Sequence, residues 1–149
     1  MAPRTIDDVA RGLRAKAFSV AEVVDDCLQR IEADNGRLNA FITVMADEAR
    51  ATAKRCDWER ANGIVRGPLH GVPVSVKDLF DAKGTVTTAA SRVREGLVAT
   101  ADAAVVAQLR RAGAVIVGKT NLHEFAFGPT NDESAFGPAR SEEHTSELQ

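Results

Sequence analysis

The sequence predicts an α/β protein. Helix-like and strand-like segments alternate along its 149 residues, which is typical of a sheet covered by helices. Two segments carry the strand prediction most clearly: the alternating stretch Val72–Lys77, and the uniformly apolar, β-branched run Ala114–Val117. A helix-like segment precedes each of them.

The first sixty residues are expected to be mostly helical. Thr5 with Asp8, and Ser19 with Glu22, have the spacing of capping boxes, in which a side chain at each end satisfies a backbone amide of the other. After the second box, apolar residues recur at helical intervals and predict a buried stripe. The stripe comprises Val20, Val23, Val24, Cys27, Leu28 and Ile31.

Asn35-Gly36 is expected to end this second helix, because both residues tolerate the left-handed backbone conformation of a helix terminus. Phe41–Val44 then predicts a short strand. An alanine-rich helix follows at Ala46–Ala61, with Gly63 just beyond its end.

The character of the sequence changes at Gly67. In the alternating strand, Val72, Val74 and Val76 should face one way, and Pro73, Ser75 and Lys77 the other. Residues 81–100 are loop-like. Asp102 is expected to cap a helix that runs through Ala112 and stops at Gly113, and Asn121 with Glu124 should frame a further short helix start.

Composition excludes several function classes. The formal net charge is −2, so no basic field suggests direct nucleic-acid binding. The absence of a signal peptide, or of an apolar run near the ~20 residues that span a bilayer, gives no reason to expect a membrane partner and makes the cytoplasm the default location. Cys27 and Cys56 should be reduced thiols, and the scattered histidines predict no metal site and no cofactor.

Lys77 is the residue with the strongest indication of chemistry. The alternative is a solvated ion pair with Asp78. Lys77, however, ends a strand between Gly-Pro turns, where functional groups often lie, and Val76, Leu79 and Phe80 around it are apolar enough to desolvate an amine. Burial favours the neutral form of a lysine, which is the form that acts as a general base.

Gly113–Thr120 formally fits the phosphate-binding pattern G-x-x-x-x-G-K-[ST], which would suggest a non-catalytic nucleotide-binding module. In a phosphate loop the middle residues curl so that backbone amides face the anion. Here they are the predicted strand itself, so we expect no nucleotide binding.

Residues 67–139 closely resemble the amidase-signature hydrolases, and residues 5–62 are similar to them in layout. Several motifs occur in the family's order, which makes the resemblance specific. The matching stretches are Gly67–Asp78, Asp102–Asn121, Glu124-Phe125 and Asn131–Pro138.

The resemblance implies a large mixed, twisted sheet flanked by helices, incomplete in this chain, and hydrolysis of a carbon–nitrogen amide bond. Its chemistry is a Ser–cis-Ser–Lys triad, in which Lys77 matches the lysine. That lysine would deprotonate a bridging serine, which activates the nucleophilic serine to form an acyl-enzyme. In the family both serines follow the Phe-Gly-Pro stretch, so we expect this chain to lack them and to be inactive alone.

The resemblance also suggests neighbouring site residues. Phe127 and Gly128 match a stretch that lines the acyl pocket, with plain packing of Phe125 and Phe127 as the alternative. Ser75 should be structural, because side chains two apart on a strand lie about 7 Å apart. In the loop 87–91, Ala90 replaces the family's usual glycine, which puts a special backbone conformation there in doubt.

The substrate should be a small-molecule amide. Within the family, one branch is the glutamine-hydrolysing subunit of a tRNA-dependent amidotransferase, so the expected partners are a second copy in a homodimer or other amidotransferase subunits. We expect residues 1–139 to be the N-terminal part of a single amidase-signature domain. Residues 140–149 resemble the translation of a sequencing adapter and are expected to be a non-native tail, with a divergent exposed terminus or a purification leftover as the alternatives.

Overall fold

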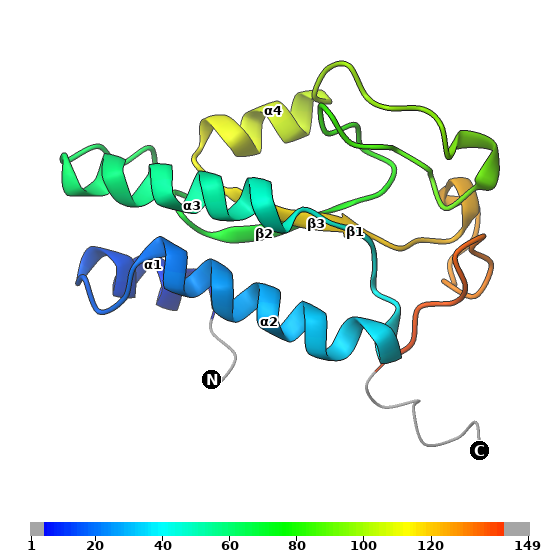
Figure 1. The fold of residues 1–149 in the computed structure, drawn as a ribbon, viewed down its shortest axis with the longest axis horizontal. Helices are drawn as coiled ribbons and strands as arrows, with labels where there is room; N and C mark the ends of the chain where they lie inside the picture. The colour runs from blue at the N-terminus through cyan, green and yellow to red at the C-terminus, as the bar shows by residue number, and fades with distance from the viewer. Residues whose placement is uncertain (1–4, 142–149) are drawn as a thin grey trace.

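The structure, a computed structural model, describes residues 5–141. Residues 142–149, most of the tail expected to be non-native, lie outside the described range. The regular elements follow one another along the chain as Figure 1 shows. They are α1 Ile6–Arg14, α2 Val20–Leu38, β1 Phe41–Val44, α3 Ala46–Ala61, β2 Pro73–Lys77, α4 Ala104–Arg111 and β3 Val115–Thr120, with the short 3-10 turns η1 Arg92–Arg94 and η2 Glu124–Ala126.

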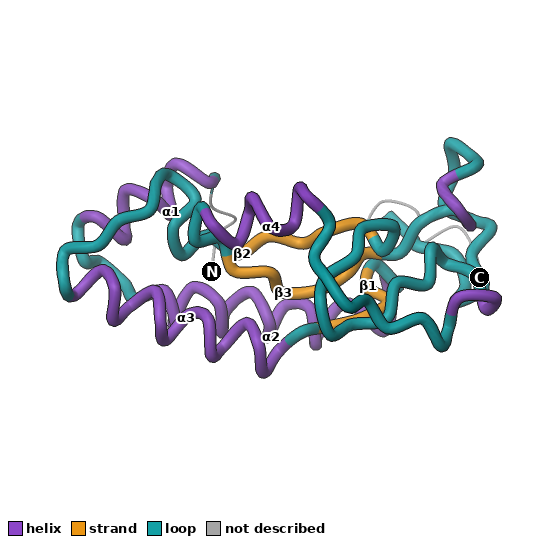
Figure 2. Tube along the Cα trace, turned by 90° about the horizontal axis from the view of Figure 1, so that it is seen from above, coloured by secondary structure: helices purple, strands orange, loops and turns teal. Residues whose placement is uncertain are grey.

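The strands form a mixed sheet in the order β1-β3-β2, in which β3 pairs antiparallel with β1 and parallel with β2. Helices α2 and α3 lie along one face of the sheet and α4 along the other (Figure 2). Alternate residues of β3 enter the two cores: Val115 and Val117 pack with α2 and α3, and Ile116 packs with Val106 of α4. The prediction of a sheet flanked by helices is confirmed.

Both predicted capping boxes are present. The side chains of Thr5 and Ser19 accept from the amides of Asp8 and Glu22, whose carboxylates accept in return from the cap amides. The stripe on α2 is buried as expected, except that Cys27 is only partly covered. The local cap and the apolar stripe therefore agree on where α2 begins and which face it buries.

The expected end of α2 at Asn35-Gly36 is wrong, because the helix runs on to Leu38. The left-handed residue is Asn39, at φ 49°, and its amide donates to the carbonyl of Asn35. The Asn35 side chain reaches past this turn and both donates to and accepts from the backbone of Phe41. Asn35 thus fixes the chain reversal from inside the helix.

Asp102 does not cap α4, contrary to the prediction. The helix begins at Ala104 after Ala103, which makes no side-chain capping bond. The Asp102 carboxylate instead accepts from the amide of Lys83 at 2.7 Å and lies 3.1 Å from Nε of Arg110. A tertiary role for the acid has replaced the local one.

The strand predicted at Ala114–Val117 extends further, to Thr120, because it continues to pair with both neighbours. Asn121 consequently lies at the strand end and does not frame a helix. Its side-chain amide donates to the carbonyls of Asn39 and Gly137, and the following turn begins only at Glu124. Among the described residues, no helix is long and apolar enough to cross a membrane.

Candidate active site

Lys77 is the last residue of β2, and the predicted alternation along this strand is present. Val72 and Val76 are buried, whereas Ser75 and Lys77 are exposed on the opposite face. Within residues 5–141 the Lys77 amine makes no hydrogen bond or ion pair. Ser75 is likewise exposed, and among residues 5–141 its hydroxyl has no hydrogen-bond partner.

The expectation that apolar neighbours desolvate the Lys77 amine is wrong for the described residues. Leu79 and Phe80 are themselves 41% and 39% exposed, so they form no cover over it. The buried valines cannot serve either, because strand alternation directs them to the other face of β2. The free face around Lys77 is therefore an open, partly apolar surface.

The alternative of a Lys77–Asp78 ion pair is also not found. Asp78 is completely buried, and its Oδ1 lies 2.6 Å from Nζ of Lys119, which is equally buried. The two neighbours in sequence thus point to different environments. The acid is engaged by another cation, and the amine of Lys77 stays available.

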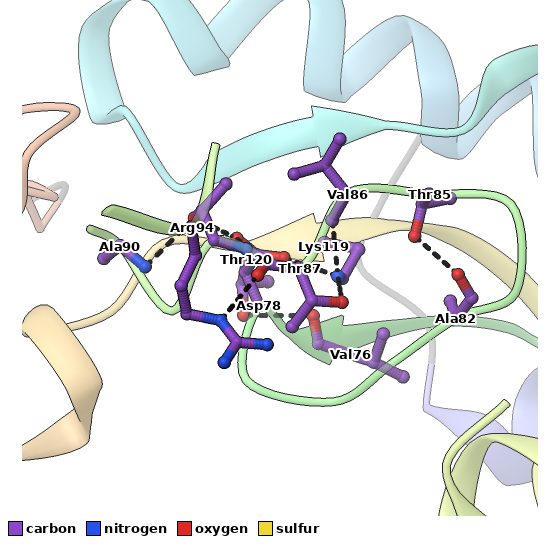
Figure 3. A network of polar contacts seen from close by, with 11 residues as sticks. Val76, Asp78, Ala82, Thr85, Val86, Thr87, Ala90, Arg94, Lys119 and Thr120 are labelled. Atoms are coloured by element: carbon purple, nitrogen blue, oxygen red, sulfur yellow. Dashed lines mark hydrogen bonds and ion pairs between the residues drawn. The ribbon is translucent and has the colours of Figure 1, made fainter. Parts of the chain in front are cut away.

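Lys119 lies in the middle of a polar network beneath the loop that follows β2 (Figure 3). Besides Asp78, its amine donates to the carbonyl of Val86 at 2.8 Å and to Oγ1 of Thr87 at 2.6 Å. Because this lysine and its neighbours in the phosphate-loop-like stretch form β3, their backbone amides belong to the sheet ladder and cannot enclose an anion. The interpretation of that motif as a strand is confirmed.

The loop 87–91 is fully buried and held from several sides. The backbone amide and hydroxyl of Thr88 donate to Oδ2 of Asp78, and the Ala89 amide donates to the Asp78 carbonyl. Ala89 and Ala90 have φ values of 52° and 57°. The special conformation that the missing glycine put in doubt is therefore adopted by alanine, in spite of its Cβ.

Phe127 and Gly128 lie in the segment that follows η2. Phe127 is 95% exposed and Phe125 is 50% exposed, so the alternative of plain core packing does not describe them. A Cβ on Gly128 would lie 2.3 Å from the His123 ring, which explains why this position has no side chain. The described contacts link this segment to Lys77 only through the loop 87–91, because the Phe125 amide donates to the carbonyl of Ala89.

A second polar cluster, which sequence spacing did not reveal, joins α3 to the turn before β2. Ligand atoms of Cys56, Glu59 and His70, all buried, lie within 4.8 Å of one another. The protein itself satisfies them: Arg66 clamps the Glu59 carboxylate with its guanidinium, and its amide donates to Nδ1 of His70. That bond assigns the imidazole proton to Nε2, 3.0 Å from Glu59, so the nitrogen that faces the cluster has no lone pair for a metal.

Electrostatics in this cluster agree with a neutral histidine beside a charged acid. Burial lowers the pKa of His70, although Glu59 opposes the shift. The hydrogen bond from Arg66 holds the pKa of Glu59 below its usual range. Cys56 is a free thiol that donates to the Gly113 carbonyl, and burial raises its pKa. The cluster is a structural ion-pair network.

Comparison with known proteins places this geometry in a family. The amidase family model matches residues 22–144. The glutamyl-tRNA(Gln) amidotransferase of Anaeromyxobacter dehalogenans has an A-type subunit that is 51% identical over 134 residues, which cover 90% of this chain and 27% of the relative. The corresponding protein of Granulibacter bethesdensis is 49% identical over 137 residues, with 92% and 27% covered.

Solved structures agree. The native peptide amidase of Stenotrophomonas maltophilia superposes with a TM-score of 0.85 at 37% identity, over 93% of this chain and 30% of its own. A protein from a vestigial complex related to the origins of an s-triazine catabolic enzyme superposes with a TM-score of 0.91 at 38% identity, over 95% and 31%.

The fold and the matching motifs define an amide-hydrolase lineage, and the chain belongs to the amidase-signature family, of which it carries an N-terminal portion. It spans less than a third of the length of these relatives.

Proposed function

We propose that this chain supplies the lysine of an amide-hydrolysing site, with Lys77 as the base of a Ser–cis-Ser–Lys triad. The single observation that supports it most is the contrast at the end of β2: Lys77 is exposed and unpaired within residues 5–141, while the acid next to it is buried and neutralised by Lys119. A surface lysine beside an aspartate would ordinarily be expected to share its charge.

In the proposed reaction the Lys77 amine accepts the proton of a bridging serine, which deprotonates the nucleophilic serine as it attacks the amide carbonyl. The carbon–nitrogen bond breaks, the amine product leaves with a returned proton, and an acyl-enzyme remains. Water then releases the acid. Both serines, and the surface that would desolvate Lys77, would come from the rest of a longer protein, so we propose that the chain alone is inactive.

A chimera tests the proposal. Residues 5–139 would replace the matching part of the A. dehalogenans relative, whose own residues would provide the remainder of the domain. We expect the chimera to release ammonia from a small amide such as glutamine. Lys77→Ala should reduce kcat by about 10²–10⁴-fold, the usual contribution of a general base.

Lys54→Ala is the matched control, because Lys54 is an exposed lysine on α3, where alanine is a good helix former. It should leave kcat unchanged. An active chimera that retains full activity with Lys77→Ala would eliminate Lys77 as the base.

A finer proposal is that the longer protein is the glutamine-hydrolysing subunit of a tRNA-dependent amidotransferase, acting in the cytoplasm with partner subunits. The identity of about half to the two amidotransferase relatives favours it. The chimera should then hydrolyse glutamine faster when the partner subunits of the A. dehalogenans enzyme and glutamyl-tRNA are present. Equal rates with and without them would favour an independent amidase.

A further inference from the structure

Lys119 is a buried cation on a strand otherwise made of apolar residues. It is 0% exposed and lies beside Val76 in the parallel pairing of β3 with β2. Oxygens of Asp78, Val86 and Thr87 surround its amine at 2.6–2.8 Å. Since an ion pair of this kind is commonly no more stabilising than an apolar pair of similar volume, its presence suggests a role in orientation.

Asp78 connects this cation to the loop that follows β2. Its Oδ1 faces Lys119, and its Oδ2 accepts from the amide and the hydroxyl of Thr88. Its backbone amide donates to the carbonyl of Thr120, and its carbonyl accepts from the amide of Ala89. Asp78 therefore holds β3 on one side and the loop on the other, directly after Lys77.

The loop itself is in a conformation that needs such support. Two consecutive alanines, Ala89 and Ala90, have left-handed backbones, which are unfavourable for residues with a Cβ and persist only where the surroundings enforce them. The hydroxyl of Thr88, fixed by Asp78, accepts from the amide of Ala90. The ion pair and the threonine thus enforce the turn.

The loop transmits this geometry to the segment that carries Phe127. The carbonyl of Ala89 accepts from Phe125 at 2.8 Å, and that of Ala90 accepts from Ala135 at 3.0 Å. Both ends of the candidate site, the strand end at Lys77 and the segment after η2, are therefore bonded to the same two residues.

We propose that Lys119 and Asp78 are positioning residues for Lys77: their buried ion pair locks the loop 87–91 against the end of β2 and keeps the aspartate away from the Lys77 amine. This inference rests on the proposed function for its catalytic consequence. Lys119 and Asp78 touch no reacting atom in this scheme. They act through the direction of Lys77 and through the shared loop.

The test uses the active chimera with the double substitution Lys119→Met and Asp78→Asn, which removes both charges together and leaves no buried ion unpaired. We expect kcat to fall by about tenfold or more while KM changes by less than about twofold, since a misdirected base weakens the transition state alone. Hydrogen exchange at the amides of Ala89 and Phe125 should become about tenfold faster or more, because the bonds that protect them loosen.

The matched control is Arg50→Met with Asp25→Asn, which removes an exposed ion pair between α2 and α3. It should change neither kcat nor exchange at Ala89. Thr88→Val provides a second variant that keeps both charges and the side-chain shape but deletes the hydroxyl, and it should change both measurements in the same direction as the double substitution.

The two proposals fail in different ways. A chimera without amidase activity would count against the proposed function, and hydrogen exchange in its variants would still decide whether the pair locks the loop. An active chimera in which the double variant and Thr88→Val match the control in both measurements would overturn the positioning role. A lowered melting temperature with unchanged kcat per folded molecule would overturn it too, since the pair would then be structural only.

Discussion

The carbonyl oxygen of Thr43 lies where a side chain on Gly118 would have to be: a Cβ at that position would come within 2.5 Å of it. β1 and β3 approach so closely here because Val44 pairs with Gly118 across the antiparallel ladder. The glycine that completes the phosphate-loop-like pattern is thus required by strand packing.

Gly118→Ala should destabilise the fold by about 1–3 kcal/mol, because the methyl group would meet a backbone atom that cannot rotate away. Gly36→Ala is the matched substitution: Gly36 lies within α2, is exposed and has open space where the Cβ would be. It should stabilise the protein by about 1 kcal/mol through helix propensity. Urea unfolding measures both, and effects of the same sign would contradict the packing argument.

Asn39 should anchor the C-terminal segment to the end of α2. Its side-chain amide donates to the carbonyls of Phe136 and Gly137 at 2.9 and 3.0 Å. Asn39→Gly keeps the left-handed backbone and deletes these bonds, so we expect a loss of about 1–3 kcal/mol. Trypsin should also cleave faster at Arg140, whose amide is bonded to Leu38.

Asn62→Gly is the control for this prediction, because the Asn62 side-chain amide donates to Trp58 within the same helix end. Cleavage at Arg140 should be unchanged in that variant. If Asn39→Gly also left the cleavage rate unchanged, the contact between α2 and residues 136–138 would not hold the segment.

His70 should make stability depend on pH. Its pKa in the folded protein is lowered from the ordinary 6.5, so between the two values the unfolded chain binds more protons and the free energy of unfolding rises with pH. This contribution is complete above 6.5 and is lost as the pH falls. Glu59, whose pKa is lowered from 4.5, adds a loss in the more acidic range below that value.

His70→Gln should flatten the part of the stability curve below pH 6.5 while the acidic loss from Glu59 remains, because glutamine can still donate to that carboxylate. Chemical unfolding at a series of pH values gives the slope. A slope between pH 5 and 6.5 as steep as that of the unsubstituted protein would show that another group titrates there.

Local signals predicted the helices well, because their causes are close in sequence. Ser19 with Glu22 forms its capping box from residues three apart, and the stripe from Val20 to Ile31 needs only helical periodicity. The errors arose where a distant partner took over: Asp102 was drawn to Lys83 and Arg110, and Asn121 to Gly137. Such contacts have no signature in the spacing of residues.

The site was predictable as far as the strand and no further. Alternation along β2 correctly separated Val76 from Lys77, but it could not say whether anything covers the lysine. Lys119 was overlooked as a buried cation because its place in a phosphate-loop-like pattern drew attention to its motif. The usable signal was a single charge at the end of the apolar run Val115–Val117, since such a charge must find a partner inside the protein.

Phe127 offers a test of the proposed acyl pocket that is independent of the base. Its ring is 95% exposed within the described residues, so truncation should change stability by less than about 0.5 kcal/mol. If the ring contacts substrate equally before and during reaction, Phe127→Ala in the chimera should raise KM by about tenfold with kcat unchanged. Val93→Ala, at an 85% exposed side chain, is the control for surface truncation and should alter neither constant. A fall in kcat without a change in KM would place the Phe127 ring at the reacting atoms, and no change in either constant would remove it from the pocket.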